Sequence, residues 1–289
     1  MQGTLPLIYI LGTQRGGTTV ASSLLTAIPG TAFIGETLRI SAPFEERFCG
    51  CGSVPTNCPV WSQLLADGTI DSRARREFAE LGSEALGTGA EKAKSEYGAR
   101  MIQLYRRYAQ ATRATVVIDG SKDPDLGRLV AALDGLNVHF IHVVRDPRGV
   151  VRSVVKRTNG GWLEKRVVAV KTALWYLLRQ RRCRALLGSS LGRSVTTVRY
   201  EDLVRHPSAF IASVSKHLGI RMAEADEMSL PTSHSLRRRD RPRRPTLPLV
   251  EDRSWVRDLG FTDMLVTTLV TLPYIRRFGY PARRPRDDR

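Results

Sequence analysis

Apolar runs alternate with segments of helical periodicity along most of the chain. Buried strands are expected where apolar residues dominate, at 4–11, 114–119, 137–144 and 194–200. Helical patterns follow these runs after short turns, at 18–27, 126–133, 148–157 and 207–218. Strands that alternate with helices form parallel sheets that are covered on both faces. The pattern therefore predicts an α/β fold, a three-layer sandwich with a central parallel sheet of about four to five strands.

Longer segments lie between and after these units. The segments 72–110 and 162–187 show helical periodicity and are expected to cover the sheet or to form a wall of a substrate site. From 231 to 250 the sequence is rich in Pro and Arg, which predicts a long basic loop before a last helix near 262–272. The tail, 283–289, is expected to be disordered. No internal repeat or linker is evident, so we expect a single domain over the whole chain.

The turn after the first strand, "GTQRGGTT", is similar to a nucleotide phosphate-binding turn that lacks its lysine. In the register G-x-x-x-x-G-K-[ST], Thr18 occupies the lysine position. Gly16 and Gly17 allow close approach of the backbone, the amides at the start of the helix point outwards, and Thr19 adds a hydroxyl donor. Arg15 brings a positive charge into the turn. These features predict a P-loop-like anion site.

Composition adds two expectations. The formal charge is +17, mostly from arginine, whose planar guanidinium suits bidentate recognition of phosphate and similar oxyanions. An Arg-rich surface without a ligand is the other interpretation. No apolar stretch is long enough for a membrane span, and the first apolar run lacks the basic residues of a signal peptide. We therefore expect a cytoplasmic protein with an anionic ligand.

Two further strand ends carry groups that suit an anion site, and open α/β sheets bind their ligands at this edge. The turn "DGSKDP" begins with Asp119 at a strand end, and Lys122 follows it. The turn "RDPRGVVRS" places Arg145 at the next strand end and Ser153 further along the following helix. A local ion pair between Arg145 and Asp146 is the alternative to an anion-binding role. Together the three turns predict one anion site.

These motifs resemble those of sulfotransferases that use 3'-phosphoadenosine 5'-phosphosulfate. "GTQRGGTT" is similar to the 5'-phosphosulfate loop of that family, "VVRDPRGVVRS" to its 3'-phosphate motif, and "VRYEDLVRHP" to its segment after the fourth strand. The elements "IGE", "CGCG…CPVW" and "DGSK" resemble the bacterial branch of the family. The resemblance covers residues 5–280, approximately, and implies a transferase with a P-loop-like sandwich fold.

The resemblance also implies roles for individual residues. Residues expected to bind the nucleotide are Arg15, Gly16, Gly17, Thr18, Thr19, Arg145, Ser153 and Tyr200. Those of the first turn would hold the 5'-phosphate and the sulfuryl group, Arg145 and Ser153 would hold the 3'-phosphate, and Tyr200 would pack near the adenine. Sulfotransferases of this family work without a metal ion, so none is expected for the reaction.

Sulfuryl transfer needs a base for the proton of the acceptor and positive charge near the leaving phosphate. Relatives place a glutamate where "FIGET" places Glu36, expected at the next strand end beside the anion loop. Glu36 is therefore the candidate base, and a solvated loop carboxylate or an ion pair with Arg39 are the alternatives. Lys122 and Arg15 are the candidate catalytic cations; an exposed turn lysine beside Asp123 is the alternative for Lys122.

The C-terminal segment departs from the family pattern. In related sequences a Gly-Asn-Pro-x-Arg loop closes over the nucleotide after a His-Ser pair, whereas here His234 and Ser235 are followed by "LRRRDRPRR". Arg241, Arg243 or Arg244 would take over the phosphate contact, and the sequence does not choose among them. The departure leaves open weak cofactor binding or loss of activity.

Three cysteines lie close together in the sequence. Cys49, Cys51 and Cys58 supply soft ligands without an evident fourth, and their C-x-C-x6-C spacing departs from that of usual zinc sites. A structural loop near the acceptor site is the favoured interpretation, and a disulfide or a metal are the alternatives. The sequence therefore predicts no metal site.

Two other functions stay open. A P-loop-type small-molecule kinase is supported by the first turn and Asp119 and opposed by Thr18. A nucleic-acid-binding protein is suggested by "RRRDRPRR" but lacks an aromatic stacking platform and a helix-turn-helix signal. The favoured partner is a small-molecule, carbohydrate or lipid acceptor with a hydroxyl or amine, and no nucleic acid. The sequence gives neither the identity of the acceptor nor the oligomeric state.

Overall fold

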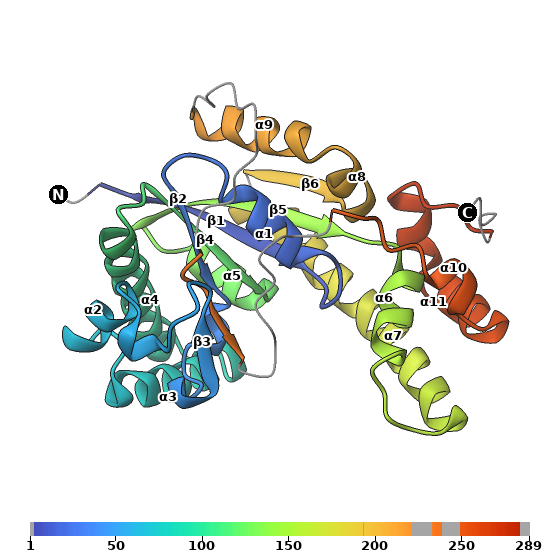
Figure 1. Cartoon of the computed structure of the whole chain (residues 1–289), viewed down its shortest axis with the longest axis horizontal. Helices are drawn as coiled ribbons and strands as arrows, with labels where there is room; N and C mark the ends of the chain where they lie inside the picture. The colour runs from blue at the N-terminus through green and yellow to red at the C-terminus, as the bar shows by residue number, and fades with distance from the viewer. Residues whose placement is uncertain (1–2, 193, 221–232, 239–248, 284–289) are drawn as a thin grey trace.

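A computed structural model of the chain describes residues 3–192, 194–220, 233–238 and 249–283 and has a central five-stranded sheet (Figure 1). The strands are β1 (Leu5–Gly12), β2 (Thr31–Gly35), β4 (Val116–Lys122), β5 (Leu136–Val144) and β6 (Val195–Arg199). Their order across the sheet is β2-β4-β1-β5-β6, and every neighbouring pair is parallel. The predicted parallel sheet is confirmed.

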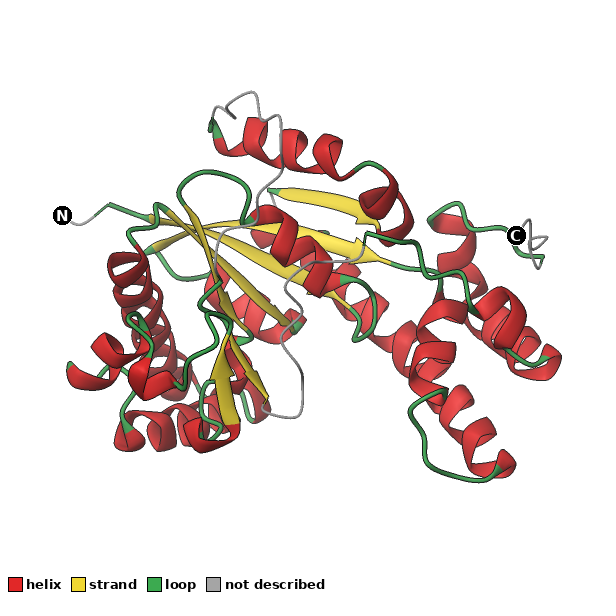
Figure 2. Ribbon diagram, in the orientation of Figure 1, coloured by secondary structure: helices red, strands yellow, loops and turns green. Residues whose placement is uncertain are grey.

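Helices cover both faces of this sheet (Figure 2). Side chains of β1 point to the two faces of the sheet in turn. Ile8 and Ile10 pack with α1 (Thr18–Leu25), α8 (Tyr200–Arg205) and α9 (Pro207–Leu218). Leu7, Tyr9 and Leu11 pack with α4 (Glu91–Thr112), α5 (Pro124–Ala131) and the end of α7 (Trp162–Leu187). Residues of a strand point to opposite faces in turn, and both faces of β1 are apolar because both are buried. The three-layer sandwich predicted from the sequence is confirmed.

Most helices lie where the sequence pattern places them. Their bounds are α1 (Thr18–Leu25), α2 (Trp61–Ala66), α3 (Ser72–Gly87), α4 (Glu91–Thr112), α5 (Pro124–Ala131), α6 (Pro147–Val155), α7 (Trp162–Leu187), α8 (Tyr200–Arg205), α9 (Pro207–Leu218), α10 (Trp255–Asp258) and α11 (Phe261–Arg277). The predicted helical segment 72–110 is divided into two helices, because Gly89, with φ of 75°, interrupts it. The predicted last helix begins at Phe261 and continues through Pro273 to Arg277. Within the described ranges, no helix combines the length and the apolar composition needed to cross a membrane.

A second, small sheet joins distant parts of the chain. The strand β3 (Arg47–Cys49) pairs antiparallel with β7 (Leu236–Arg238). Neither strand was predicted, because three residues are too few to show a hydrophobic period. Residues 236–238 of the predicted basic loop are thus a strand rather than a loop, whereas 231–232, 239–248 and the tail 284–289 lie outside the described residues.

A buried ion pair anchors the start of α6. Asp146 caps this helix, and its carboxylate binds the Arg148 guanidinium through Nε (2.9 Å) and Nη2 (2.6 Å). Arg148 is fully buried, stacks on the Trp255 ring at 4.2 Å and donates to the Pro281 carbonyl. Asp146 therefore pairs with Arg148 and not with Arg145, so Arg145 is released for other contacts.

The pH dependence of stability should reflect a buried histidine on β5. Burial lowers the pKa of His142 to about 4, while its Nε2 lies 3.0 Å from Gln180 Oε1. An unfolded histidine has a pKa of about 6.5, so the unfolded state binds the proton first as the pH falls. We expect the free energy of unfolding to drop by roughly 3 kcal/mol for this group between about pH 6.5 and pH 4.

Denaturant titrations across this pH range test the expectation. The His142→Gln variant, which keeps a donor for Gln180, should show a shallower loss of stability towards acid. The exposed His206 offers a matched control through His206→Gln. If both variants changed the pH dependence of the free energy of unfolding by the same amount, the loss of stability towards acid could not be assigned to His142.

Candidate active site

The turn between β1 and α1, residues 12–19, has the geometry of an anion-binding loop and is called the phosphate loop below. The Gly16 amide donates to the Thr13 carbonyl at 3.1 Å, and Arg15 and Gly17 have φ of 62° and 88°. The amides of Val20 and Ala21 both donate to the Gly17 carbonyl. The amides before them open the helix, where backbone N–H groups have no acceptor within the helix and attract anions.

Glycine is required in this loop by the space around it. A Cβ at Gly16 would lie 2.8 Å from Thr13 Oγ1, and a Cβ at Gly17 would lie 2.3 Å from Cδ2 of Tyr200. The Thr13 hydroxyl is buried and has no hydrogen-bond partner among the described residues. An unsatisfied buried hydroxyl beside free helix amides suits a ligand with acceptor oxygens.

Arg145 joins the end of β5 to the phosphate loop. Its Nη1 donates to the Arg15 carbonyl at 2.9 Å, and its Nη2 donates to the carbonyl (3.1 Å) and a carboxylate oxygen (3.0 Å) of Asp252. The guanidinium also lies 4.5 Å from the centre of the Tyr200 ring, in a cation–π contact. Arg145, which was predicted to bind an anion, therefore lies beside the phosphate loop. Its contacts hold its side chain in one orientation.

Asp252 is a part of this arrangement that sequence reasoning missed. Burial by itself would raise the pKa of Asp252, but hydrogen bonds from Ser254 and Arg145 and the charge of Arg145 outweigh it and lower the pKa. Tyr200 holds the same segment, because its hydroxyl lies 3.4 Å from the Asp252 amide. The sequence carries no signal for this contact, since Asp252 follows a Pro- and Arg-rich stretch far from Arg145.

Glu36 and Lys122 form an ion pair at the same edge of the sheet. Lys122 Nζ binds Glu36 Oε1 and donates to the Gly120 carbonyl, and Arg39 Nε lies 3.2 Å from Glu36 Oε2. Burial lowers the pKa of Lys122, and the Glu36 carboxylate opposes this shift. Lys122 is 13% exposed, so it is not the exposed turn lysine that the sequence left as an alternative.

The strand order corrects the expected position of Glu36. The strand β4 lies between β2 and β1, so Glu36 does not stand at the strand end next to the phosphate loop. Lys122 holds that place, because it pairs in register with Leu11, one residue before the loop. Glu36 is thus two strand spacings, or roughly 10 Å, from β1 and is connected to it through Lys122.

Asp119 is not available as a ligand for magnesium. It is fully buried, and its two oxygens accept hydrogen bonds from Tyr105 Oη (2.6 Å), the Ser121 amide (2.7 Å), Ser121 Oγ (2.6 Å) and Thr37 Oγ1. Burial raises the pKa of Asp119, and the hydrogen bonds from Ser121, Thr37 and Tyr105 oppose the shift. The acid that supported a kinase is therefore a structural group that ties η1 (Thr37–Arg39) to β4 and α4.

The other predicted residues differ in where they lie. Thr18 is buried and Thr19 is exposed at the start of α1, whereas Ser153 lies half-buried in the second turn of α6. No hydrogen bond joins Ser153 to Arg145 within the described residues, so its role stays a prediction. The three candidate arginines of the closing segment, Arg241, Arg243 and Arg244, lie outside the described residues.

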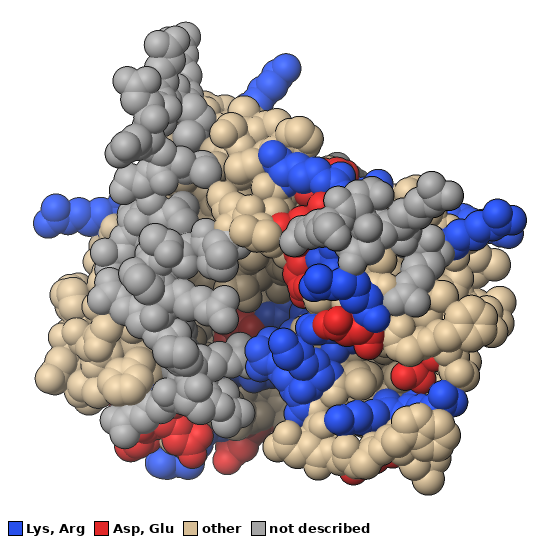
Figure 3. Space-filling model, turned by 45° about the vertical axis from the view of Figure 1, so that its right-hand side comes forward, with Lys and Arg blue, Asp and Glu red and all other residues tan. Residues whose placement is uncertain are grey.

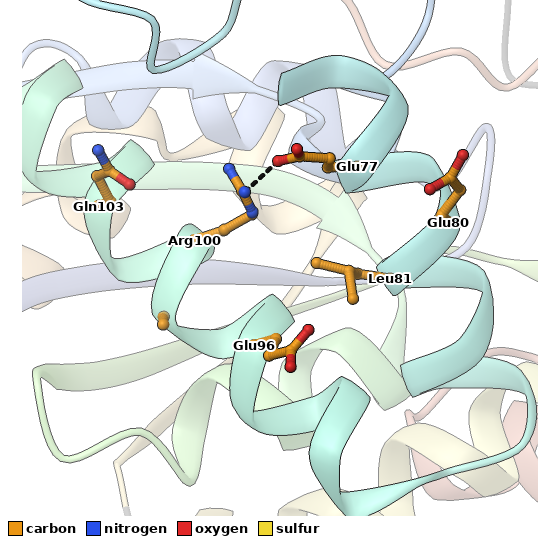
Figure 4. Close-up of a pocket in the computed structure, with 7 residues that line it drawn as sticks. Glu77, Glu80, Leu81, Glu96, Arg100 and Gln103 are labelled. Atoms are coloured by element: carbon orange, nitrogen blue, oxygen red, sulfur yellow. Dashed lines mark ion pairs between the residues drawn. The ribbon is translucent and has the colours of Figure 1, made fainter. Parts of the chain in front are cut away.

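The surface shows where basic groups gather. Lys and Arg side chains collect around the centre of the face in Figure 3, with Asp and Glu side chains beside them. A separate pocket between α3 and α4 is drawn in Figure 4, where Arg100 forms an ion pair with Glu77. Its lining residues come from these two helices and not from the strand ends, and they include Glu80 and Glu96. This acidic pocket is therefore distinct from the predicted anion site.

Comparison with known proteins identifies the family. A model described as the sulfotransferase family matches residues 6–224, so the chain belongs to this family and is a transferase enzyme. The sulfotransferase domain of the Synechococcus PCC 7002 olefin synthase is 18% identical, with 97% of each chain covered and a TM-score of 0.51, and shows the same fold. A sulfotransferase from Alicyclobacillus acidocaldarius is 13% identical, with 96% of each chain covered and a TM-score of 0.47. A search of curated proteins finds no match.

The packing of Tyr200 on the phosphate loop can be tested with glycine variants. In Gly17→Ala the new methyl group meets the Tyr200 ring at a backbone φ of 88°, so we expect a loss of roughly 1–3 kcal/mol in the free energy of unfolding. The Tyr200 ring would also be pushed towards Arg145. Urea unfolding measures the loss in the free energy of unfolding.

A matched control is Gly87→Ala at the end of α3, where the new Cβ meets nothing within 4 Å. This variant should be neutral or more stable by up to about 1 kcal/mol, because alanine has the higher helix propensity. Equal destabilisation of the two variants would show that the Tyr200 contact is not the cause.

Proposed function

We propose that this sulfotransferase moves the sulfuryl group of 3'-phosphoadenosine 5'-phosphosulfate to a hydroxyl or amine of a small molecule, glycan or lipid in the cytoplasm. The observation that carries the proposal is the order of charged groups along one sheet edge. The parallel strands place Glu36, Lys122, the phosphate loop and Arg145 there in this sequence. Groups that suit a base, a cation and two anion sites thus follow each other across the edge, and in-line transfer uses groups of these kinds.

The phosphate loop suits the 5' end of the donor. Gly16 and Gly17 leave the backbone open, the helix amides supply fixed donors, and the unsatisfied Thr13 hydroxyl adds another. Arg15 adds a positive charge that cannot be lost near neutral pH. These residues would hold the 5'-phosphate and the sulfuryl group and would stabilise the charge that develops on the leaving phosphate.

Arg145 suits the 3'-phosphate of the donor. A guanidinium has five N–H donors, and three of them serve Arg15 and Asp252 among the described contacts. Two N–H donors of Arg145 therefore remain for an anion. The three hydrogen bonds and the contact with the Tyr200 ring fix the direction in which these two donors point. A side chain that is already oriented loses little entropy on binding, which favours affinity.

Glu36 suits the role of the base. Its carboxylate oxygens bind Lys122 and Arg39, and the side chain is 35% exposed. A carboxylate has about four acceptor positions, so positions remain for the proton of an acceptor. As the acceptor oxygen or nitrogen bonds to sulfur, the bond from sulfur to the phosphate oxygen breaks, the proton passes to Glu36, and the phosphate leaves with the negative charge. Lys122, held between Glu36 and the loop, would balance charge on the sulfuryl oxygens.

Calorimetry with the product nucleotide tests the donor. We expect 3'-phosphoadenosine 5'-phosphate to bind and ATP with magnesium not to compete. Arg145→Ala should weaken binding on the order of 10–100-fold, since charge-assisted hydrogen bonds are lost. Arg152→Ala is the matched control on the helix that follows Arg145, α6, because Arg152 pairs with Asp258. Tight binding of ATP with magnesium, or equal losses in both variants, would overturn the assignment.

Variants of Glu36 test the base separately from binding. Glu36→Gln should lower the turnover of sulfuryl transfer about 100–10,000-fold, because a base is lost. The affinity for 3'-phosphoadenosine 5'-phosphate should be nearly unchanged. The turnover is measured as the rate at which the labelled sulfuryl group of 3'-phosphoadenosine 5'-phosphosulfate is transferred to a panel of phenols, sugars and amines, and to water.

Because Glu36→Gln also leaves Lys122 without its counter-charge, the double variant Glu36→Gln with Lys122→Met separates the two effects. If Glu36 is the base, a single Lys122→Met variant keeps more turnover than Glu36→Gln and the double variant, with normal nucleotide binding in all three. Recovery of turnover in the double variant would show that Glu36 only neutralises Lys122.

A further inference from the structure

Cys49, Cys51 and Cys58 meet His234, the fourth ligand that the sequence did not reveal. Their three sulfur atoms and the His234 ring nitrogen all lie within 4.8 Å of one another. The histidine comes from 176 residues beyond Cys58 in the chain. Cys49 and Cys58 are buried, whereas Cys51 and His234 are half-buried. Three soft sulfur ligands and one imidazole form the donor set that structural zinc sites use.

The distances suit a tetrahedral ion. Cys58 Sγ lies 3.3 Å from His234 Nδ1 and 3.4 Å from Cys49 Sγ, and Cys49 Sγ lies 3.6 Å from the same nitrogen. Zn–S bonds of about 2.3 Å and Zn–N bonds of about 2.0–2.1 Å give tetrahedron edges of roughly 3.8 Å and 3.6 Å. Shifts of a few tenths of an ångström would bring these three atoms to coordination distance, and Cys51 Sγ, which lies within 4.8 Å of each of them, would move by up to about 1 Å.

We propose that Cys49, Cys51, Cys58 and His234 bind one zinc ion in a closed structural site. All four positions of the tetrahedron are filled by the protein, so the site has no open position for a substrate. The unusual C-x-C-x6-C spacing is explained, because the fourth ligand comes from a distant segment rather than from the cysteine stretch. This site is separate from the sulfuryl-transfer site and does not depend on the proposed donor or acceptor.

The surroundings of the cluster hold His234 in place. Trp61 Nε1 donates to the His234 carbonyl at 2.6 Å, and the Gly50 amide donates to the Ser235 carbonyl at 2.9 Å. A Cβ at Gly50 would lie 2.3 Å from the Ser233 carbonyl oxygen, so the two segments touch through their backbones. Oriented ligands reduce the entropy lost on metal binding, and such supporting contacts are typical of metal sites.

The metal would fix a segment that borders the active site. His234 lies two residues before β7, which pairs with β3, and both Ser235 and Leu236 lie about 3.5 Å from the Cβ position of Gly35. Gly35 is the residue before Glu36. A zinc ion would therefore hold the start of the basic stretch against the strand end that carries the proposed base. This consequence, unlike the site itself, rests on the proposed function.

Elemental analysis of the full-length chain tests the site. The protein is purified with a non-chelating reductant and dialysed against zinc-free buffer. We expect about one zinc per chain, which Cys58→Ser and His234→Ala should reduce to background. Cys183→Ala is the matched control, because Cys183 is a buried cysteine of α7 outside the cluster. Equal zinc loss in the control would overturn the proposal.

Cobalt replacement covers the case in which a ligand variant fails to fold. The wild-type chain, stripped of metal and loaded with Co²⁺, should show the strong visible bands of a tetrahedral ion and thiolate charge-transfer absorption in the near ultraviolet. Octahedral, weakly absorbing cobalt would overturn the proposal. So would a metal-free chain in which mass spectrometry finds a Cys49–Cys58 disulfide.

Discussion

The contact of Arg145 with the phosphate loop connects the separate parts of the candidate active site. One guanidinium binds the Arg15 carbonyl, binds Asp252 and stacks on Tyr200. It thereby joins β5, the phosphate loop, the end of β6 and the C-terminal segment at one point. Because these groups are fixed before any ligand binds, the edge of the sheet presents oriented donors rather than mobile side chains.

Buried polar groups behind this edge serve the fold rather than the chemistry. Asp119 gathers Tyr105, Thr37 and Ser121, and the Asp146–Arg148 pair fastens the C-terminal region to α6. Each buried charge has hydrogen-bond partners, as the cost of burial demands. The charged residues of these sequence motifs therefore differ in exposure. Asp119 and Arg148 are fully buried and stabilise the fold, whereas the Glu36 side chain is partly exposed.

The sulfotransferase family accounts for a phosphate loop without lysine. In this chain the positive charge comes from Arg15 in the loop and from Lys122 and Arg145 at the neighbouring strand ends. The three cations come from three neighbouring turns at one edge of the sheet. The Cys–His cluster lies where β3 and β7 pair, next to the strand end that carries Glu36.

Local periodicity and motifs of adjacent residues were enough to predict the parallel sheet, most of its helices, the phosphate loop and the strand-end residues Lys122 and Arg145. The order of the strands could not be predicted in this way, so Glu36 was expected next to the loop, whereas β4 lies between them. The partner of Arg145, the enclosure of Asp119 and the meeting of His234 with three cysteines became evident only from the folded chain. Such contacts join residues that are distant along the chain, and no local pattern of side chains records which of many possible partners the packing brings together.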